Sequence, residues 1–427
     1  MAVSESERPS LLFLSHTLPY PPDGGGWIRT YHLMRQLSRA FRITALCFER
    51  SGDPEHDAED ALLHLGEFAE VEAFPVPEEQ SKVRKISDHA RSLLHRRVFT
   101  VFKHQSNAFR TRLKYLLDNR EFGLVHLDTL DLSAFLPLLK QPPVVCGHHN
   151  VESQLLCRRA EAEDNPLMRV YLAHQAKLQR EEERRWCGRV DLNVTVSETD
   201  RQTLEELVPG AETKVIPNGV DVDHFKPQWH MEQSGLAFVG AEWWFPNKDA
   251  MTHFGKDILP LLRARFPGVK VRWVGAADEE TKTDFREEYG IEVLGYVDDI
   301  RPHVHEAACY VVPIRVGGGS RLKILDAWAM GKAVVSTSQG CEGLCAQDGE
   351  NILIRDSAEA FAEAVARILD DADLRKRLGH RARATVEQIY SWDTIGDRLI
   401  DTYMALVKRD GPENTDDRSG RSDGGAV

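Results

Sequence analysis

The 427-residue sequence lacks any apolar run that approaches the roughly 18 residues of a membrane-spanning helix. Its start, Met1–Pro9, lacks the basic and apolar segments of a signal peptide. It also lacks a positive surplus, because 54 Lys and Arg stand against 67 Asp and Glu, which argues against a nucleic-acid-binding protein. The seven cysteines are scattered and odd in number. We therefore expect reduced thiols and a cytoplasmic protein.

Short apolar runs alternate with longer amphipathic stretches along the whole sequence. This alternation predicts an α/β fold built from βαβ units with parallel sheets. In the first half the predicted strands are 11–15, 43–48, 124–127, 144–147 and 192–196. In the second half they are 236–239, 271–274, 291–294, 310–313 and 333–336.

The length suits two domains of about 200 residues each. Pro217-Asn218-Gly219 has strong turn chemistry between the two halves. We predict a first Rossmann-like domain over 10–205 and a second over 206–390. The polar segment 410–427 is rich in Gly, Asp and Ser, a composition that predicts a disordered tail.

A first glycine-rich segment lies between the first predicted strand and the helix that follows it. Gly25 and Gly26 there let backbone N–H groups approach a diphosphate, and the helix start adds favourable partial charge. Arg29, one turn further on, adds a charged donor. A tight strand-to-helix turn without a ligand is the alternative interpretation.

A second glycine-rich segment, 317–319, carries the strongest functional pattern. A strand leads into three glycines and then into a helix whose first turns bear two cations. Free N–H groups, the helix dipole and cationic side chains together favour a pyrophosphate, without a metal ion. The predicted donor-binding residues here are Gly318, Gly319, Ser320, Arg321, Lys323 and Asp326. The alternative is a glycine-rich turn with solvated charges.

Gly317–Gly331 resembles the donor-site helix of the group 1 glycosyltransferases. Further segments that resemble this family are 18–25, 148–153, 194–198 and 216–221. The resemblance spans roughly 10–405 and is greatest to sugar transferases of exopolysaccharide synthesis. It implies a GT-B fold, in which two Rossmann-like domains face each other across a cleft and a helix at 391–409 crosses back to the first domain. It also implies a nucleotide-sugar donor, retention of configuration and no cofactor.

Three residues are the predicted catalytic groups: His149, Arg321 and Lys323. The resemblance favours His149 over His148 as a contact of the donor sugar or the acceptor, although a histidine at a strand end is commonly structural. The sequence departs from the family in two ways. The usual pair of glutamates is replaced by Gly318 and Asp326, and an arginine usual after the first strand of the second domain is absent.

One segment differs in charge from the rest of the chain. Residues 81–120 contain eleven Lys or Arg against two Asp, with apolar residues between them. Such a segment suits an anionic membrane surface. We hypothesise that it recruits a lipid-linked acceptor at the inner face of a membrane. A solvated helical face is the equally weighted alternative.

The sequence therefore predicts a glycosyltransferase that uses a nucleotide sugar and a glycan or lipid-linked acceptor. Two alternatives remain open: a sugar-nucleotide epimerase of the same fold, and a non-catalytic nucleotide-sugar-binding partner of a polysaccharide assembly system. An NAD-dependent enzyme is disfavoured because neither glycine segment has the dinucleotide spacing. Asp221-Val222-Asp223 looks like a metal motif but lies in the interdomain turn, so no metal site is predicted.

Overall fold

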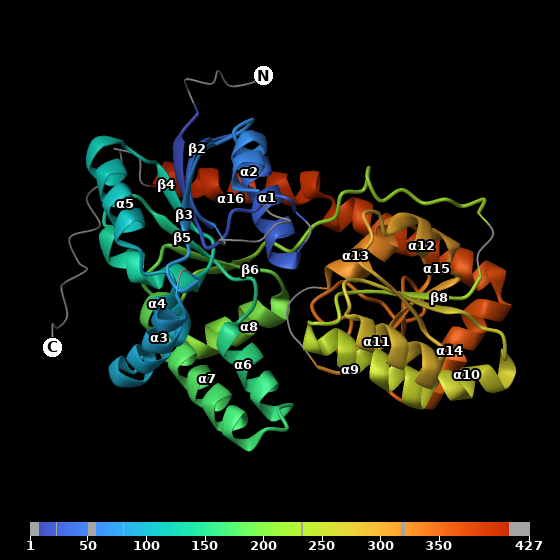
Figure 1. Ribbon diagram of the computed structural model, residues 1–427. Coiled ribbons are helices and arrows are strands. Elements are labelled where there is room, and N and C mark those ends of the chain that lie inside the picture. The colour runs from blue at the N-terminus through green and yellow to red at the C-terminus, as the bar shows by residue number, and fades with distance from the viewer. Residues whose placement is uncertain are drawn as a thin grey trace.

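The computed structural model describes residues 8–22, 24–49, 57–79, 81–231, 234–316 and 321–409. Within these ranges the chain forms two domains side by side, each with a parallel sheet between helices (Figure 1). The predicted α/β class with two Rossmann-like domains is thus confirmed. The tail at 410–427 lies outside the described residues.

The first sheet has seven parallel strands. In order across the sheet they are β3 (Glu70–Pro75), β2 (Arg42–Glu49), β1 (Ser10–Ser15), β4 (Leu124–Leu127), β5 (Val144–Gly147), β6 (Leu192–Thr195) and β7 (Thr213–Val215). Strand side chains alternate between the two faces, so Leu12 and Leu14 enter one apolar cluster while Leu11 and Phe13 enter another. Both faces are therefore buried.

The first domain's helices follow from amphipathic segments between these strands. They are α1 (Gly25–Leu37), α2 (Ala58–Leu65), α3 (Lys82–His95), α4 (Phe99–Lys103), α5 (Asn107–Asn119), the 3₁₀ helix η2 (Leu130–Leu138), α6 (Glu152–Glu161), α7 (Pro166–Trp186) and α8 (Glu198–Leu207). Side-chain caps fix several starts. Ser197, for example, accepts a hydrogen bond from the Asp200 N–H at the start of α8.

The second sheet has six parallel strands. In order across the sheet they are β10 (Glu292–Gly295), β9 (Val271–Val274), β8 (Leu236–Val239), β11 (Cys309–Val312), β12 (Val334–Ser336) and β13 (Leu353–Ile354). The helical segments of the second domain are α9 (Phe245–His253), η3 (Phe254–Ile258), α10 (Leu259–Arg265), α11 (Glu279–Asp284), η4 (Phe285–Tyr289), α12 (Arg301–Glu306), α13 (Leu322–Ala329), α14 (Ala358–Asp370), α15 (Ala372–Thr385) and η5 (Val386–Tyr390). The ten predicted strands all occur, within two residues of their predicted ends.

The domain boundary lies further along the chain than predicted. Residue 205 falls inside α8, and the strand after it, β7, pairs with β6 of the first sheet. The first domain therefore continues to Val215, and the correct crossing point is the turn at 216–220. The predicted boundary at 205/206 was wrong because β7 is a short, half-exposed edge strand that does not stand out as an apolar run.

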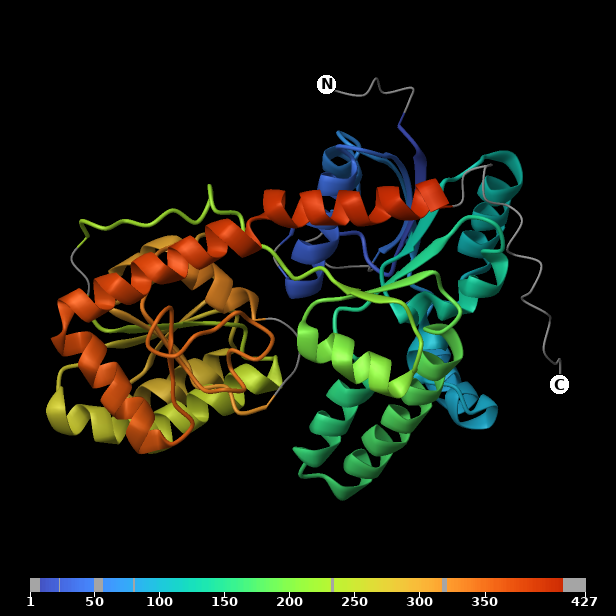
Figure 2. The same ribbon diagram turned by 180° about the vertical axis from the view of Figure 1, so that it is seen from behind.

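The last helix, α16 (Trp392–Arg409), returns to the first domain, as predicted for 391–409. Figure 2 shows it lying along that domain. Its buried side chains Ile395, Leu399 and Tyr403 belong to the same apolar cluster as Leu11 and Phe13 of β1. The first domain is thus completed by the end of the chain.

Arg29 ties the first helix to the interdomain turn. Its guanidinium donates to the carbonyl oxygen of Ile216 at 2.9 Å, to that of Pro217 at 3.2 Å and to Asn218 Oδ1 at 2.8 Å. The side chain is 1% exposed, and burial lowers its pKa to about 10. The prediction that Arg29 contacts the donor diphosphate is therefore corrected: its hydrogen bonds hold the turn.

Replacing Arg29 with Met should destabilise the protein by about 3 kcal/mol, because two buried carbonyls and an amide lose their donors. The measurement is the urea midpoint followed by intrinsic fluorescence. Arg35→Met is the matched control, since Arg35 is exposed on the same helix and should change stability by less than about 0.5 kcal/mol. Equal effects of the two substitutions would contradict the assigned role of Arg29.

Candidate functional site

The carboxyl edges of the two sheets face each other. Arg158 on α6 of the first domain forms an ion pair with Glu342, which lies in the loop that follows β12 of the second. Gly25, at the start of α1, lies beside Leu322, at the start of α13: a Cβ added to Gly25 would be 3.7 Å from Leu322 Cδ1. The start of α1 and the start of α13 therefore lie close together, at the edge where α/β sheets usually bind ligands. The second glycine-rich segment, 317–319, lies outside the described residues.

Asp128 organises the first-domain wall of this site. It follows β4 and is 1% exposed. Four polar atoms lie within hydrogen-bonding distance of the Asp128 carboxylate: Ser15 Oγ (3.3 Å), His16 Nδ1 (3.0 Å), Thr30 Oγ1 (3.0 Å) and His149 Nε2 (3.3 Å). The ends of β1 and β5, together with helix α1, thus supply polar groups to one buried carboxylate.

Three histidines favour the ionised form of this carboxylate. Burial alone would raise the pKa of Asp128, but His149, His126 and His16 hold it well below its ordinary value. Burial opposes protonation of His16, yet the Asp128 contact raises the His16 pKa above its usual value. Because Asp128 contacts Nε2 of His149, it orients that ring and leaves Nδ1 on the other side.

His149, the histidine that the resemblance favours, is more accessible than His148 and lies near Gly26. Its side chain is 16% exposed, and a Cβ on Gly26 would lie 3.7 Å from its Nδ1. His148, in contrast, is buried with Nε2 3.0 Å from Asn193 Oδ1. Burial lowers the His148 pKa to about 4, so its neutral ring has a structural role.

The second-domain wall is cationic. Arg321 caps the start of α13, is 8% exposed and donates to the carbonyl oxygen of Gln339 at 3.2 Å. Lys323 donates to Asn247 Oδ1 at 2.5 Å and lies 4.3 Å from the ring centroid of Phe238. Gly318, Gly319 and Ser320 fall outside the described residues.

Burial shifts the pKa values of two side chains on α13, Lys323 and Asp326. Burial, and then the neighbouring Arg321, lower the pKa of Lys323 to about 7, and burial raises that of Asp326 to about 7. Among the described residues no carboxylate lies within 4.0 Å of the Lys323 ammonium. Lys323 and Asp326 nevertheless keep part of their surface accessible. A bound anion would supply the missing negative charge.

Asp128, His16 and the pair Arg158–Glu342 are not among the residues that the sequence pattern predicts for the site. Asp128 ends a strand whose residues are otherwise apolar or buried, and a polar residue at that position was a usable signal. The others are recognisable only once the strand ends are brought together. In the parts of the chain that the structure describes, no cluster of three or more His, Cys, Asp or Glu side chains could hold a metal ion.

Comparison with protein families divides the chain as the structure does. Residues 23–224 match the model described as "Glycosyltransferase Family 4", and residues 233–371 match "Glycosyl transferases group 1". A phosphatidyl-myo-inositol mannosyltransferase of Mycolicibacterium smegmatis is 28% identical over 54% of this chain and 62% of its own length. The lipopolysaccharide core biosynthesis glycosyltransferase LpsE of Rhizobium meliloti is 33% identical over 34% of this chain and 43% of its own. The chain thus spans less than two thirds of each of these two relatives.

Solved structures resemble nearly the whole chain. Sucrose-phosphate synthase from Thermosynechococcus elongatus has a TM-score of 0.69 at 16% identity, covering 93% of this chain and 99% of its own. Anabaena Alr3699/HepE, solved in complex with UDP, has a TM-score of 0.64 at 15% identity, covering 93% of this chain and 100% of its own. This likeness confirms the GT-B fold.

Lys323→Met should remove nucleoside diphosphate binding while stabilising the free protein by about 2 kcal/mol at pH 6. Because the folded pKa of Lys323 is about 7 and that of an unfolded lysine is about 10.4, the unfolded state binds more protons between these values. Wild-type stability should therefore rise over that range, and the gain from Met should shrink. Urea unfolding from pH 6 to 10 measures this.

Lys332→Met is the control for that experiment. Lys332 is also a buried lysine whose pKa burial lowers to about 7, but it precedes β12 at the opposite edge of the sheet and donates to the His305 carbonyl. It should leave nucleotide binding unchanged. Loss of binding in both variants, or in neither, would contradict the assignment of Lys323 to the site.

Asp128→Asn should lower kcat about 10- to 100-fold, because the amide can no longer hold His16 and His149 as hydrogen-bond donors. Nucleotide affinity, set by the other domain, should change less than about twofold. Asp118→Asn is the control, since Asp118 is exposed on α5. A fall in nucleotide affinity at unchanged kcat would refute this division of roles.

Proposed function

We propose that this chain, which belongs to the group 1 (family 4) glycosyltransferases by its matches over 23–224 and 233–371, transfers a sugar from a nucleotide-sugar donor to a saccharide or lipid-linked acceptor. The proposal rests on two chemically different surfaces that face each other: the polar side chains around Asp128 in the first domain and the cationic start of α13 in the second. A Cβ added to Gly25 would lie 3.7 Å from Leu322 at the start of α13, and one added to Gly26 would lie 3.7 Å from Nδ1 of His149. A donor held there has its diphosphate beside cations and its sugar towards the polar first-domain wall.

The cationic wall supplies the electrostatic part of the reaction. As the sugar–phosphate bond breaks, negative charge grows on the leaving diphosphate, and Arg321 and Lys323 stabilise that charge without rearranging. Their partial burial strengthens the interaction, because water screens it less. Asp326, one turn along α13, accepts hydrogen bonds from ribose hydroxyls once it is ionised.

The first-domain wall positions the sugar and the acceptor. His149 is oriented by Asp128 and contacts the transferred sugar or the incoming hydroxyl. The acceptor attacks from the face of the leaving phosphate, which takes the acceptor proton, so configuration is retained. Domain closure brings the two walls to working distance.

The acceptor belongs to cell-surface glycan synthesis. Named relatives are a phosphatidyl-myo-inositol mannosyltransferase and a lipopolysaccharide core glycosyltransferase, which supports a lipid-bound acceptor here. Exopolysaccharide synthesis is the narrower proposal, and the functions for which these two relatives are named do not favour it over other cell-surface glycans. No helix within the described ranges is long and apolar enough to cross a bilayer.

Helix α3 provides a surface for that contact, because its apolar side faces outward. Val83, Ile86 and Leu94 are 76%, 71% and 79% exposed, at spacings that share one helix face. Its polar side faces inward, where buried Asp88 bonds to Arg84 and Arg91. Figure 1 places α3 at the outer end of the first domain.

The segment 81–120 contributes less free positive charge than its composition indicated. Several arginines are ion-paired inside the domain: Arg84 and Arg91 with Asp88, Arg97 with Glu182, Arg112 with Glu72, and Arg120 with Glu70. Lys82, Lys85 and Arg96 remain exposed beside the apolar face of α3. We therefore confine the proposed membrane contact to α3.

Transfer is tested with the full chain and a panel of nucleotide sugars in EDTA, read by nucleoside diphosphate release and by NMR of the product. We expect one donor to be used, with an α-linked donor giving an α-linked product. Acceptor-independent isomerisation of the donor would establish an epimerase instead. Nucleotide binding without turnover would establish the non-catalytic alternative, and an inverted product would refute retention.

Ile86→Asp/Leu94→Asp should abolish co-sedimentation with phosphatidylglycerol vesicles, because it places charge on the apolar face of α3. Wild type should bind these vesicles and release them as salt rises, and should ignore phosphatidylcholine vesicles. Leu63→Asp is the control, since Leu63 is 73% exposed on another helix, α2. Vesicle binding unaffected by the double substitution would exclude α3 as the membrane surface.

A further inference from the structure

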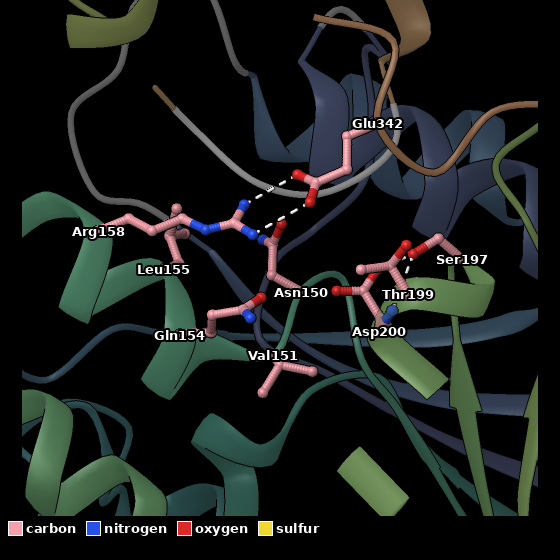
Figure 3. Close-up of a pocket in the computed structure, with 9 residues that line it drawn as sticks. All are labelled: Asn150, Val151, Gln154, Leu155, Arg158, Ser197, Thr199, Asp200 and Glu342. Carbon is pink, nitrogen blue, oxygen red and sulfur yellow. Dashed lines mark hydrogen bonds and ion pairs between the residues drawn. The ribbon is translucent and has the colours of Figure 1, made fainter. Parts of the chain in front are cut away.

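An ion pair between Arg158 and Glu342 joins the two domains near Arg321. Arg158 Nη1 and Nη2 lie 2.9 Å and 3.1 Å from the two carboxylate oxygens of Glu342, across 184 residues of sequence. Figure 3 shows the two side chains meeting head to head over a polar pocket lined by Asn150, Gln154 and Asp200. A bidentate pair of this kind fixes distance and orientation together.

On the second-domain side the pair is connected to the donor-binding arginine. Arg321 Nη2 donates to the backbone oxygen of Gln339. The Gln339 side chain in turn donates from Nε2 to Glu342 Oε2 at 2.6 Å. One residue therefore contacts both the guanidinium assigned to the diphosphate and the carboxylate that reaches the other domain.

On the first-domain side the pair is connected to the His149 segment. Arg158 lies on α6, which begins at Glu152, and the loop between His149 and that helix lines the same pocket through Asn150 and Val151. The domains also approach closely beside the pair, where Gly343 has φ +81° and a Cβ there would lie 2.8 Å from Ser197 Cβ. Arg158 is therefore part of the helix that follows the His149 loop.

We propose that Arg158 and Glu342 are positioning residues, which set the separation of the two walls and couple it to occupation of Arg321 through Gln339. The identity of the ligand at Arg321 rests on the proposed function. A diphosphate there orders the Arg321 guanidinium and hence Gln339 and Glu342, which favours the closed pair. By reciprocity, the closed pair favours diphosphate binding.

Removing a partly exposed ion pair that has no positioning role would change neither the domain separation nor nucleotide binding. The two side chains are 25% and 24% exposed, and pairs of that kind add little to stability. A matched pair exists within the first domain: Arg112 and Glu72 are 30% and 31% exposed and lie 2.6 Å apart. It bridges no domains and contacts no site residue, so it serves as the control.

The test compares Arg158→Gln, Glu342→Gln and the double variant with the same three changes at Arg112 and Glu72. Small-angle X-ray scattering gives the radius of gyration, and calorimetric titration with UDP and GDP gives nucleotide affinity. We expect each Arg158 or Glu342 change to enlarge the radius of gyration and to weaken binding about fivefold. The double variant should be no worse than either single one, because one interaction is removed in each case. The control variants should match wild type.

Other outcomes overturn the proposal. An unchanged radius of gyration would show that the pair does not set the domain separation. A larger radius with unchanged nucleotide affinity would refute the coupling through Gln339, and so would additive losses in the double variant. If wild type binds neither nucleotide, the proposed donor site and its coupling fail, while the radius of gyration still judges the positioning role. Arg158→Lys should recover binding only in part, because lysine cannot form the bidentate pair.

Discussion

The arrangement of the two domains depends on the hydrogen bonds that the buried Arg29 guanidinium donates to the interdomain turn. It belongs to α1, the helix that begins with the glycines of the site, and its hydrogen bonds end on the turn that leads into the second domain. Beside that turn, Val220 pairs with Ser391, where the chain returns. A guanidinium removed from water requires all of these acceptors, so the start of α1 and the crossing point are fixed together.

The site that results is electrostatically divided. In the first domain a buried aspartate is surrounded by histidines and hydroxyls and is well satisfied. In the second domain no described carboxylate forms an ion pair with Lys323, and burial and the neighbouring Arg321 lower its pKa to about 7. A lysine whose charged form is disfavoured by burial lowers the stability of the protein, so its presence here indicates a role other than stability. The imbalance is the clearest physical sign that an anion completes the second wall.

The sequence predicted the interior of each sheet better than its edges. Strands buried on both faces, such as β4 and β11, are continuous apolar runs and were placed correctly. Strands β3, β7 and β13 were not predicted. Each lies at an edge of its sheet, and each is very short or carries polar or half-exposed residues. An edge strand pairs on one side only, so its sequence need not be apolar. The misplaced domain boundary followed from missing β7.

By itself the sequence determined the α/β class, the two-domain organisation, the two glycine segments and the cationic helix start, because each is a local pattern of a few neighbouring residues. Only the tertiary structure decided which side chains share the site. The structure shows that Arg29 binds the interdomain turn and that His148 is buried while His149 is partly accessible. It also shows that Asp128 contacts His149 and that Arg158 pairs with Glu342. These choices depend on which strand ends become neighbours and on how the domains meet, and such long-range contacts leave no periodic trace in the sequence.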